Sequence, residues 1–130
     1  MTKKVGYKDL IAAAEAEVQS ISADEVEAKA ADGSAVLVDI RDVRELQRDG
    51  MIEGARHAPR GMLEFWIDEE SPYHKDWFAE DKLYVFYCAA AWRSLLAAQL
   101  GQNMGLKTAS LEGGLGEWKK LGKAVADYSK

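Results

Sequence analysis

The stretch that decides the fold is "LYVFYCAAAWRSLLAAQLGQNMGL", residues 83–106. It opens with a continuous apolar run, which is typical of a strand buried on both faces of a parallel sheet. Apolar residues at helical spacing follow from residue 93 onward. A short turn joins the two parts and contains Cys88, the single cysteine of the chain. This stretch therefore predicts a strand, a tight turn and a helix.

Further strands and helices alternate on either side of this stretch. The apolar run "AVLVDIR" predicts a second buried strand, and short strands are predicted at residues 54–59 and 108–114. Helices are predicted over residues 4–18, 22–33, 42–50 and 115–122. This alternation predicts an α/β fold: an open, mainly parallel central sheet of about five strands, flanked by helices on both faces.

Two of these helices have local signals in the sequence. The first shows an apolar stripe made of Val5, Leu10, Ile11, Ala14 and Val18. The second opens with Ser22 and Glu25, which have the spacing of a capping box. We expect residues 1–130 to form a single domain, with residues 1–19 as an N-terminal helical extension.

Composition excludes several classes of protein. The formal net charge of −5 argues against a nucleic-acid-binding surface. A single cysteine cannot form an internal disulfide, and no Cys/His spacing suggests a metal site, so a reducing compartment is expected. No signal peptide or long apolar run is found, because acidic residues interrupt the N-terminal segment. We expect a cytoplasmic protein without a cofactor and without a membrane partner.

The turn after the first strand is the candidate functional site. Ligands of parallel sheets bind beyond the carboxyl ends of the strands, where Cys88 is expected to lie. Ala89, Ala90 and Ala91 are small enough to let the backbone curl around a bound group, and Arg93 adds a positive charge. Free amides at a helix start favour a thiolate, which is the nucleophilic form. A purely structural role remains the alternative, because free cysteine is often buried as a small hydrophobe.

Two longer motifs resemble one known family. "VLVDIRDVRELQRDGMIEGARHAP" (36–59) and "VFYCAAAWRSLLAAQLGQNMGLKTASLEGGLGEWKKLG" (85–122) are similar to the two signatures of the rhodanese-like sulfurtransferases, in the same order. The resemblance covers roughly residues 20–123. It implies that Cys88 carries a persulfide, within a binding loop made of Ala89, Ala90, Ala91, Trp92, Arg93 and Ser94.

The length of this loop and its composition carry further expectations. A loop running from Cys88 to Arg93 has the length that accompanies sulfur transfer in the family, whereas related phosphatases and arsenate reductases have one more residue. The family often has glycine where this chain has Ala90 and Ala91. Alanine is disfavoured at positive φ, so a differently shaped loop is expected if such an angle is required.

Other polar residues have two interpretations each. Arg60 is a candidate contact for an anionic donor such as thiosulfate, whereas Asp39 and Arg41 are expected to give structural support as a buried pair. The arginines between residues 41 and 60 could instead pair on a solvated face with Asp42, Glu45, Asp49 and Glu53. Trp92 either forms a wall of the pocket or packs into the domain.

Three functional hypotheses follow from the resemblance. The first is a sulfurtransferase that moves a sulfane sulfur from thiosulfate or a persulfide donor, through Cys88, to cyanide or a cellular thiol. The second is a persulfide carrier or regulatory binding module that serves a sulfur-relay protein with little turnover of its own. A phosphatase or arsenate reductase is the third, and the loop length disfavours it.

Overall fold

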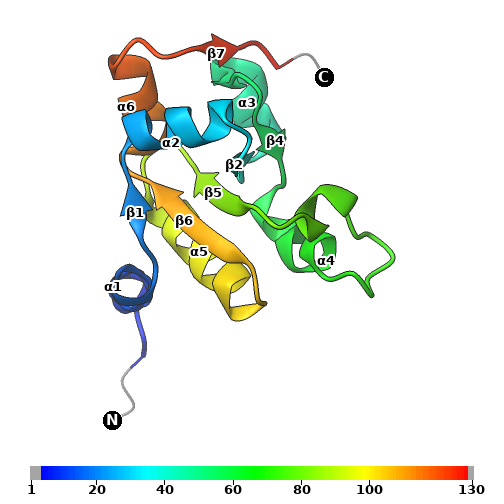
Figure 1. Ribbon diagram of the computed structural model, residues 1–130. Helices are drawn as coiled ribbons and strands as arrows, with labels where there is room; N and C mark the ends of the chain where they lie inside the picture. Colours follow the sequence, from blue (N-terminus) through cyan, green and yellow to red (C-terminus); the bar gives the residue numbers. More distant parts are fainter. Residues whose placement is uncertain (1–3, 129–130) are drawn as a thin grey trace.

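The computed structural model describes residues 4–128 (Figure 1). Its central sheet has five parallel strands in the order β1-β6-β5-β2-β4. These strands are β1 (Ser20–Ile21), β2 (Ala35–Asp39), β4 (Arg56–His57), β5 (Leu83–Tyr87) and β6 (Lys107–Leu111). The predicted α/β class with a mainly parallel sheet of about five strands is confirmed.

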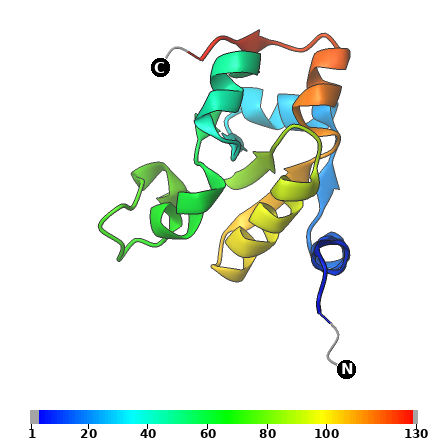
Figure 2. The ribbon, with the colours of Figure 1, turned by 180° about the vertical axis from the view of Figure 1, so that it is seen from behind.

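Helices cover both faces of this sheet (Figures 1 and 2). They are α1 (Tyr7–Glu17), α2 (Ala23–Ala31), α3 (Val43–Asp49), α4 (Leu63–Ile67), α5 (Trp92–Asn103) and α6 (Gly114–Lys120), with 3-10 turns η1 (Arg60–Met62) and η2 (Asp76–Ala79). Side chains of α2 and α6 pack on one face of the sheet, and those of α4 and α5 pack on the other. No helix within residues 4–128 is long and apolar enough to cross a bilayer.

Strand β5 shows why a continuous apolar run was needed at the centre of the sheet. Tyr84 and Phe86 pack in the core on the α5 side, and Val85 and Tyr87 pack in the core on the α6 side. All four side chains are completely buried. Successive side chains of a strand point to opposite faces, so a strand covered on both faces has no side chain that reaches solvent.

The helix starts differ in part from the predictions. The Ser22 side chain accepts a hydrogen bond from the Glu25 amide at 3.2 Å, but among the described contacts the reciprocal bond of a capping box is not formed. A complete capping box begins α3 instead: Asp42 accepts from the Arg44 amide at 2.8 Å and the Asp42 amide donates to Glu45 at 3.1 Å. Glu45 is therefore fixed at the start of α3.

The predicted apolar stripe of the first helix is partly wrong. Ile11 and Ala14 are buried against Leu95 of α5, as a stripe facing the domain requires. Val5 and Leu10, in contrast, are exposed, with relative accessibilities of 71% and 49%. Val5 precedes the first residue of α1, and Leu10 turns away from α5.

Three strands of two residues each lie outside the predictions. β1 extends the sheet beside β6, whereas β3 (Met51–Ile52) and β7 (Val125–Ala126) form a separate antiparallel pair. In Figure 1 the segment that contains β7 runs from the end of α6 toward α3. Such short strands have no periodicity of their own, because their partners far along the chain determine them.

Candidate active site

Cys88 lies at the carboxyl end of β5, where β5 runs between β2 and β6. The cysteine is buried, with 2% of its surface exposed, whereas Ala89 and Ala90 are exposed. The loop therefore places its small side chains toward solvent and its thiol at the base. This position at the carboxyl edge of a parallel sheet is the one that the sequence predicts.

The start of α6 determines how the cysteine loop is oriented. The Leu115 amide donates to the Cys88 carbonyl at 2.9 Å, and the Gly116 amide donates to the Ala89 carbonyl at 3.1 Å. In a planar trans peptide, the N–H group points opposite to the carbonyl of the preceding residue. Because these carbonyls point to α6, the amides of Ala89 and Ala90 point away from it.

Gly114 permits this close approach of the two backbones. A Cβ atom at this position would lie 2.5 Å from the Cys88 oxygen and 2.9 Å from the Ala89 oxygen, and nearer still to the Ala90 oxygen. The φ angle of Gly114 is +58°, in the left-handed region that favours glycine. Gly114 is not among the site residues expected from the sequence, although a Gly-Gly pair before a helix is a signal of a close backbone approach.

The amides of the loop are left without partners. Within residues 4–128, the N–H groups of residues 89–94 donate to no protein acceptor. These residues precede and form the first turn of α5, where intrahelical acceptors are absent. Unpaired amides at a helix start bind anionic groups, so the loop is a candidate cradle for a charged sulfur or oxyanion next to Cys88.

Ala91, one of the two alanines at the position where the family often has glycine, does not need a positive φ. Ala91 has a φ of −159°, outside the left-handed region. The Ser94 hydroxyl donates to the Ala91 carbonyl at 2.9 Å and lies 2.9 Å from the Ser110 hydroxyl of β6. Ser94 is buried, and these contacts fasten the end of the loop to the sheet.

Trp92 lies on the surface beside α1. Its side chain is 59% exposed, and its ring centroid lies 5.1 Å from that of Tyr7. The alternative in which Trp92 packs into the interior of the domain is therefore wrong. The tryptophan extends an aromatic surface from the cysteine loop to the first helix.

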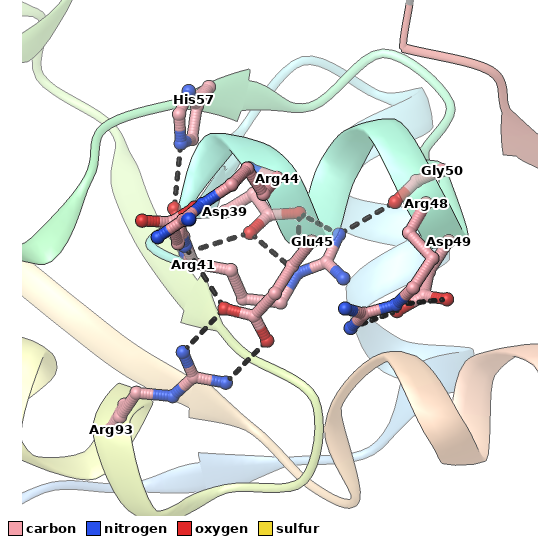
Figure 3. A network of polar contacts seen from close by, with 10 residues as sticks. Asp39, Arg41, Arg44, Glu45, Arg48, Asp49, Gly50, His57 and Arg93 are labelled. Carbon is pink, nitrogen blue, oxygen red and sulfur yellow. Dashed lines mark hydrogen bonds and ion pairs between the residues drawn. The ribbon is translucent and has the colours of Figure 1, made fainter.

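Arg93 is joined to Glu45 of α3 by two parallel hydrogen bonds (Figure 3). The Nη1–Oε1 distance is 2.8 Å and the Nη2–Oε2 distance is 3.0 Å. The Arg93 guanidinium is the main reason that the pKa of Glu45 falls to about 2. Glu45 in turn raises the pKa of Arg93 through the same hydrogen bonds.

A second, fully buried ion pair supports the carboxyl end of β2. Arg41 Nη2 lies 2.7 Å from Asp39 Oδ2 and donates to the Gly50 carbonyl at 2.6 Å, as Figure 3 shows. Burial alone would lower the pKa of Arg41, but the hydrogen bonds to Asp39 raise it above its ordinary value. The ring of His57 is held by the Arg41 carbonyl, with Nε2 2.8 Å from the oxygen. The Asp39–Arg41 ion pair thus joins β2 to Gly50 at the end of α3.

The remaining arginines fit the solvated-face interpretation in part. Arg44 pairs with Asp42 and Arg48 with Asp49 on the exposed side of α3. Arg60 starts η1 beyond the end of β2, where its amide donates to the Ile40 carbonyl at 3.1 Å. Its guanidinium lies 3.4 Å from Glu64. Glu45 departs from this interpretation, because its partner is Arg93 of the cysteine loop.

The largest described cavity lies away from Cys88. It measures about 660 Å³ and is bordered by the first half of β2 and by Trp77 and Trp118. A smaller cavity of about 170 Å³ adjoins Ala89 and the start of α6. Within residues 4–128, no three His, Cys, Asp or Glu side chains are grouped to hold a metal ion.

Residues 22–121 match the family model of the rhodanese-like domain. The chain belongs to the rhodanese-like domain family. A curated relative, "Putative sulfurtransferase YtwF" of Bacillus subtilis (strain 168), is 31% identical over 104 residues, which are 79% of this chain and 92% of the relative. The family match begins at the cap of α2, so α1 precedes it.

Solved structures show the same rhodanese-like fold. A protein of unknown function from Rhodopseudomonas palustris CGA009, RPA3614, named a possible tyrosine phosphatase, is 46% identical with a TM-score of 0.90, covering 97% of this chain and 98% of its own. The human single-domain sulfurtransferase TSTD1 is 29% identical with a TM-score of 0.68, and the match covers 79% of this chain and 96% of TSTD1. Sulfurtransferase-type chemistry is thus the activity that the family and the curated relative support.

Proposed function

We propose that this rhodanese-like domain transfers a sulfane sulfur through a persulfide on Cys88. One observation carries the proposal: the amides of residues 89–94, which directly follow the buried Cys88, have no protein acceptor, and α6 binds the carbonyls of Cys88 and Ala89. Unpaired N–H groups at a helix start stabilise a negatively charged group such as the outer sulfur of a persulfide. The acceptor would be cyanide or a cellular thiol, and a protein of a sulfur relay could supply or receive the sulfur.

The chemistry has two displacement steps. The Cys88 thiolate attacks the outer sulfur of the donor, a Cys88 S–S bond forms, and the donor leaves with the electron pair of its broken S–S bond. A nucleophilic acceptor then attacks the outer sulfur of the persulfide and regenerates the thiolate. No oxidant or resident cofactor is needed, because the sulfane sulfur leaves the donor and reaches the acceptor in the same oxidation state.

The loop length supports sulfur transfer over phosphate hydrolysis. Phosphatases of this fold have one more residue in the loop than this chain has between Cys88 and Arg93. The name of the Rhodopseudomonas relative nevertheless makes phosphate hydrolysis a result to test directly. We further propose that the protein works in a reducing compartment such as the cytoplasm, because a thiolate must remain available.

The test is the intact-protein mass after incubation with thiosulfate or a thiol persulfide, then after addition of cyanide. We expect the wild type to gain one sulfur and to lose it to cyanide, and Cys88→Ser to gain none. A folded wild type that gains no sulfur from either donor would contradict the proposal. Loading without repeated turnover would favour the persulfide carrier, and Cys88-dependent hydrolysis of an aryl phosphate would favour a phosphatase.

A further inference from the structure

The charge of Arg93 is compensated within the site. Both terminal nitrogens of its guanidinium donate to the two carboxylate oxygens of Glu45, in a geometry that holds the pair in one orientation. Glu45 is 21% exposed and remains ionised down to about pH 2, because Arg93 lowers its pKa. The loop therefore carries a guanidinium at its rim but little net positive charge.

Two other arginines near this edge of the sheet have carboxylate partners as well. Asp39 neutralises the buried Arg41, and Glu64 lies beside Arg60. Lys119, which borders the small cavity next to Ala89, is exposed and donates to the Asp49 carbonyl at 2.8 Å, a neutral acceptor that leaves the charge of the ammonium in place. The attraction for an anion at Cys88 thus comes from the loop amides, whose partial charges equal about half an elementary charge at a helix start, and from this solvent-screened ammonium.

We propose that Glu45 sets the donor preference of the site, so that it favours a thiol persulfide over thiosulfate. This inference rests on the proposed sulfur transfer. A persulfide carries at most one charge on its sulfur pair, which the loop amides can hold. Thiosulfate brings a second charge, and the guanidinium that could receive it is already bound to Glu45. Glu45 is a specificity-determining residue that acts through Arg93.

The transfer from a persulfide balances without any further reactant. The Cys88 thiolate attacks the outer sulfur of R–S–SH, a new S–S bond forms, and the R–S bond to that sulfur breaks. The thiolate R–S⁻ leaves with the electron pair, and the proton of the persulfide is released to solvent or to the leaving thiolate. Cyanide then removes the outer sulfur as thiocyanate.

The test compares Glu45→Gln with the wild type for two donors, thiosulfate and the persulfide of the uncharged thiol N-acetylcysteamine, with cyanide as acceptor. Glutamine is accepted at this capping-box position, so α3 can keep its start while the charge is removed. The matched control is Glu27→Gln on α2, whose partner is Lys123 and which makes the same change in net charge. Glu45→Asp keeps the charge and serves as the conservative variant.

We expect Glu45→Gln to raise the ratio of kcat/KM for thiosulfate to kcat/KM for the persulfide by about fivefold, the upper range for a part-exposed ion pair. The change should appear as a lower KM for thiosulfate and should shrink as salt is added. Glu27→Gln and Glu45→Asp should keep the wild-type ratio.

Two results would overturn this preference while leaving the proposed function intact. The first is an equal fall of kcat/KM for both donors in Glu45→Gln, which would make Glu45 a purely structural support of the loop. The second is a change of the donor ratio in Glu27→Gln that equals the change in Glu45→Gln, which would assign the effect to the overall charge of the protein. If neither donor loads Cys88 of the wild type, the sulfur transfer itself is wrong, whatever the variants do.

Discussion

At the scale of single residues, the cysteine loop depends on the absence of a side chain at Gly114. Three successive carbonyl oxygens, those of Cys88, Ala89 and Ala90, lie where a Cβ atom at this position would stand. Alanine at this position would have to displace the loop or the start of α6, and it would also adopt a left-handed φ. The thiol and its cradle are thus shaped from a position far along the chain from Cys88.

We predict that Gly114→Ala lowers the free energy of unfolding by more than about 2 kcal/mol and abolishes sulfur loading of Cys88. Gly122→Ala is the matched control, because Gly122 has a similar φ of +76° but a methyl group there would meet no atom within 4 Å. Gly122→Ala should lower the free energy of unfolding by about 1 kcal/mol and leave the sulfur loading of Cys88 intact. Urea unfolding and intact mass measure the two effects, and equal behaviour of the variants would contradict the role given to Gly114.

At the scale of elements, the Glu45–Arg93 pair joins α3 to the start of α5. The pKa of Glu45 falls from 4.5 to about 2 in the folded protein, chiefly because Arg93 donates to it. A carboxylate with a lowered pKa stabilises the fold above its unfolded pKa and loses this contribution as the pH falls through the folded value. The stabilising contribution of this pair is therefore lost between about pH 4.5 and pH 2.

We predict that Glu45→Gln is less stable than the wild type by about 1–2 kcal/mol at neutral pH, after allowance for solvent screening of the exposed guanidinium. The difference should shrink steadily as the pH falls below 4.5. Glu64→Gln, which removes a longer and more exposed ion pair with Arg60, should differ from the wild type by less than about 0.5 kcal/mol at each pH. A difference for Glu45→Gln that is independent of pH would contradict the prediction.

The longer elements could be predicted because their patterns are local. The apolar runs at 35–41 and 83–88 appear as β2 and β5, and their successive side chains pack alternately into the two cores on opposite faces of the sheet. The helix after Cys88 and the strand at 108–114 also appear, as α5 and β6. The two-residue strands β1, β3 and β7 could not be predicted, because hydrogen bonds to distant partners define them rather than periodicity.

The position of the cysteine could be predicted from the sequence, but the partner of Arg93 could not. A cysteine between a buried strand and a helix is a local pattern, and the structure places it at the sheet edge as expected. The partner of Arg93 lies 48 residues away, so no spacing rule could choose Glu45 over its acidic neighbours. The anion contact of Arg60 stays a prediction, as does the assignment of residues 1–19 as an extension to one domain.

At the scale of the whole molecule, α1 and the sheet differ in how they are held. β5 has a strand on either side and a core on each face, whereas α1 packs on α5 through Ile11 and Ala14. Regions with few buried contacts open locally at lower free energy than the global unfolding. We expect the first helix to open while the sheet stays intact.

Amide hydrogen exchange tests this expectation. The amides of β5 should exchange slowest, with the free energy of global unfolding, and those of α1 should exchange faster. Ile11→Ala, which removes a buried contact with Leu95, should speed exchange in α1 further and leave β5 nearly unchanged. Exchange of α1 as slow as that of β5 would mean that the helix and the sheet unfold as one unit.

The contact between the cysteine loop and the start of α6 has a consequence for biosynthesis. The loop carbonyls are held by the amides of Leu115 and Gly116, which leave the ribosome well after Cys88. A nascent or proteolytically shortened chain that stops before these residues would expose a free thiol without the hydrogen bonds that orient its amides. The proposed persulfide site would thus be complete only once translation has passed α6.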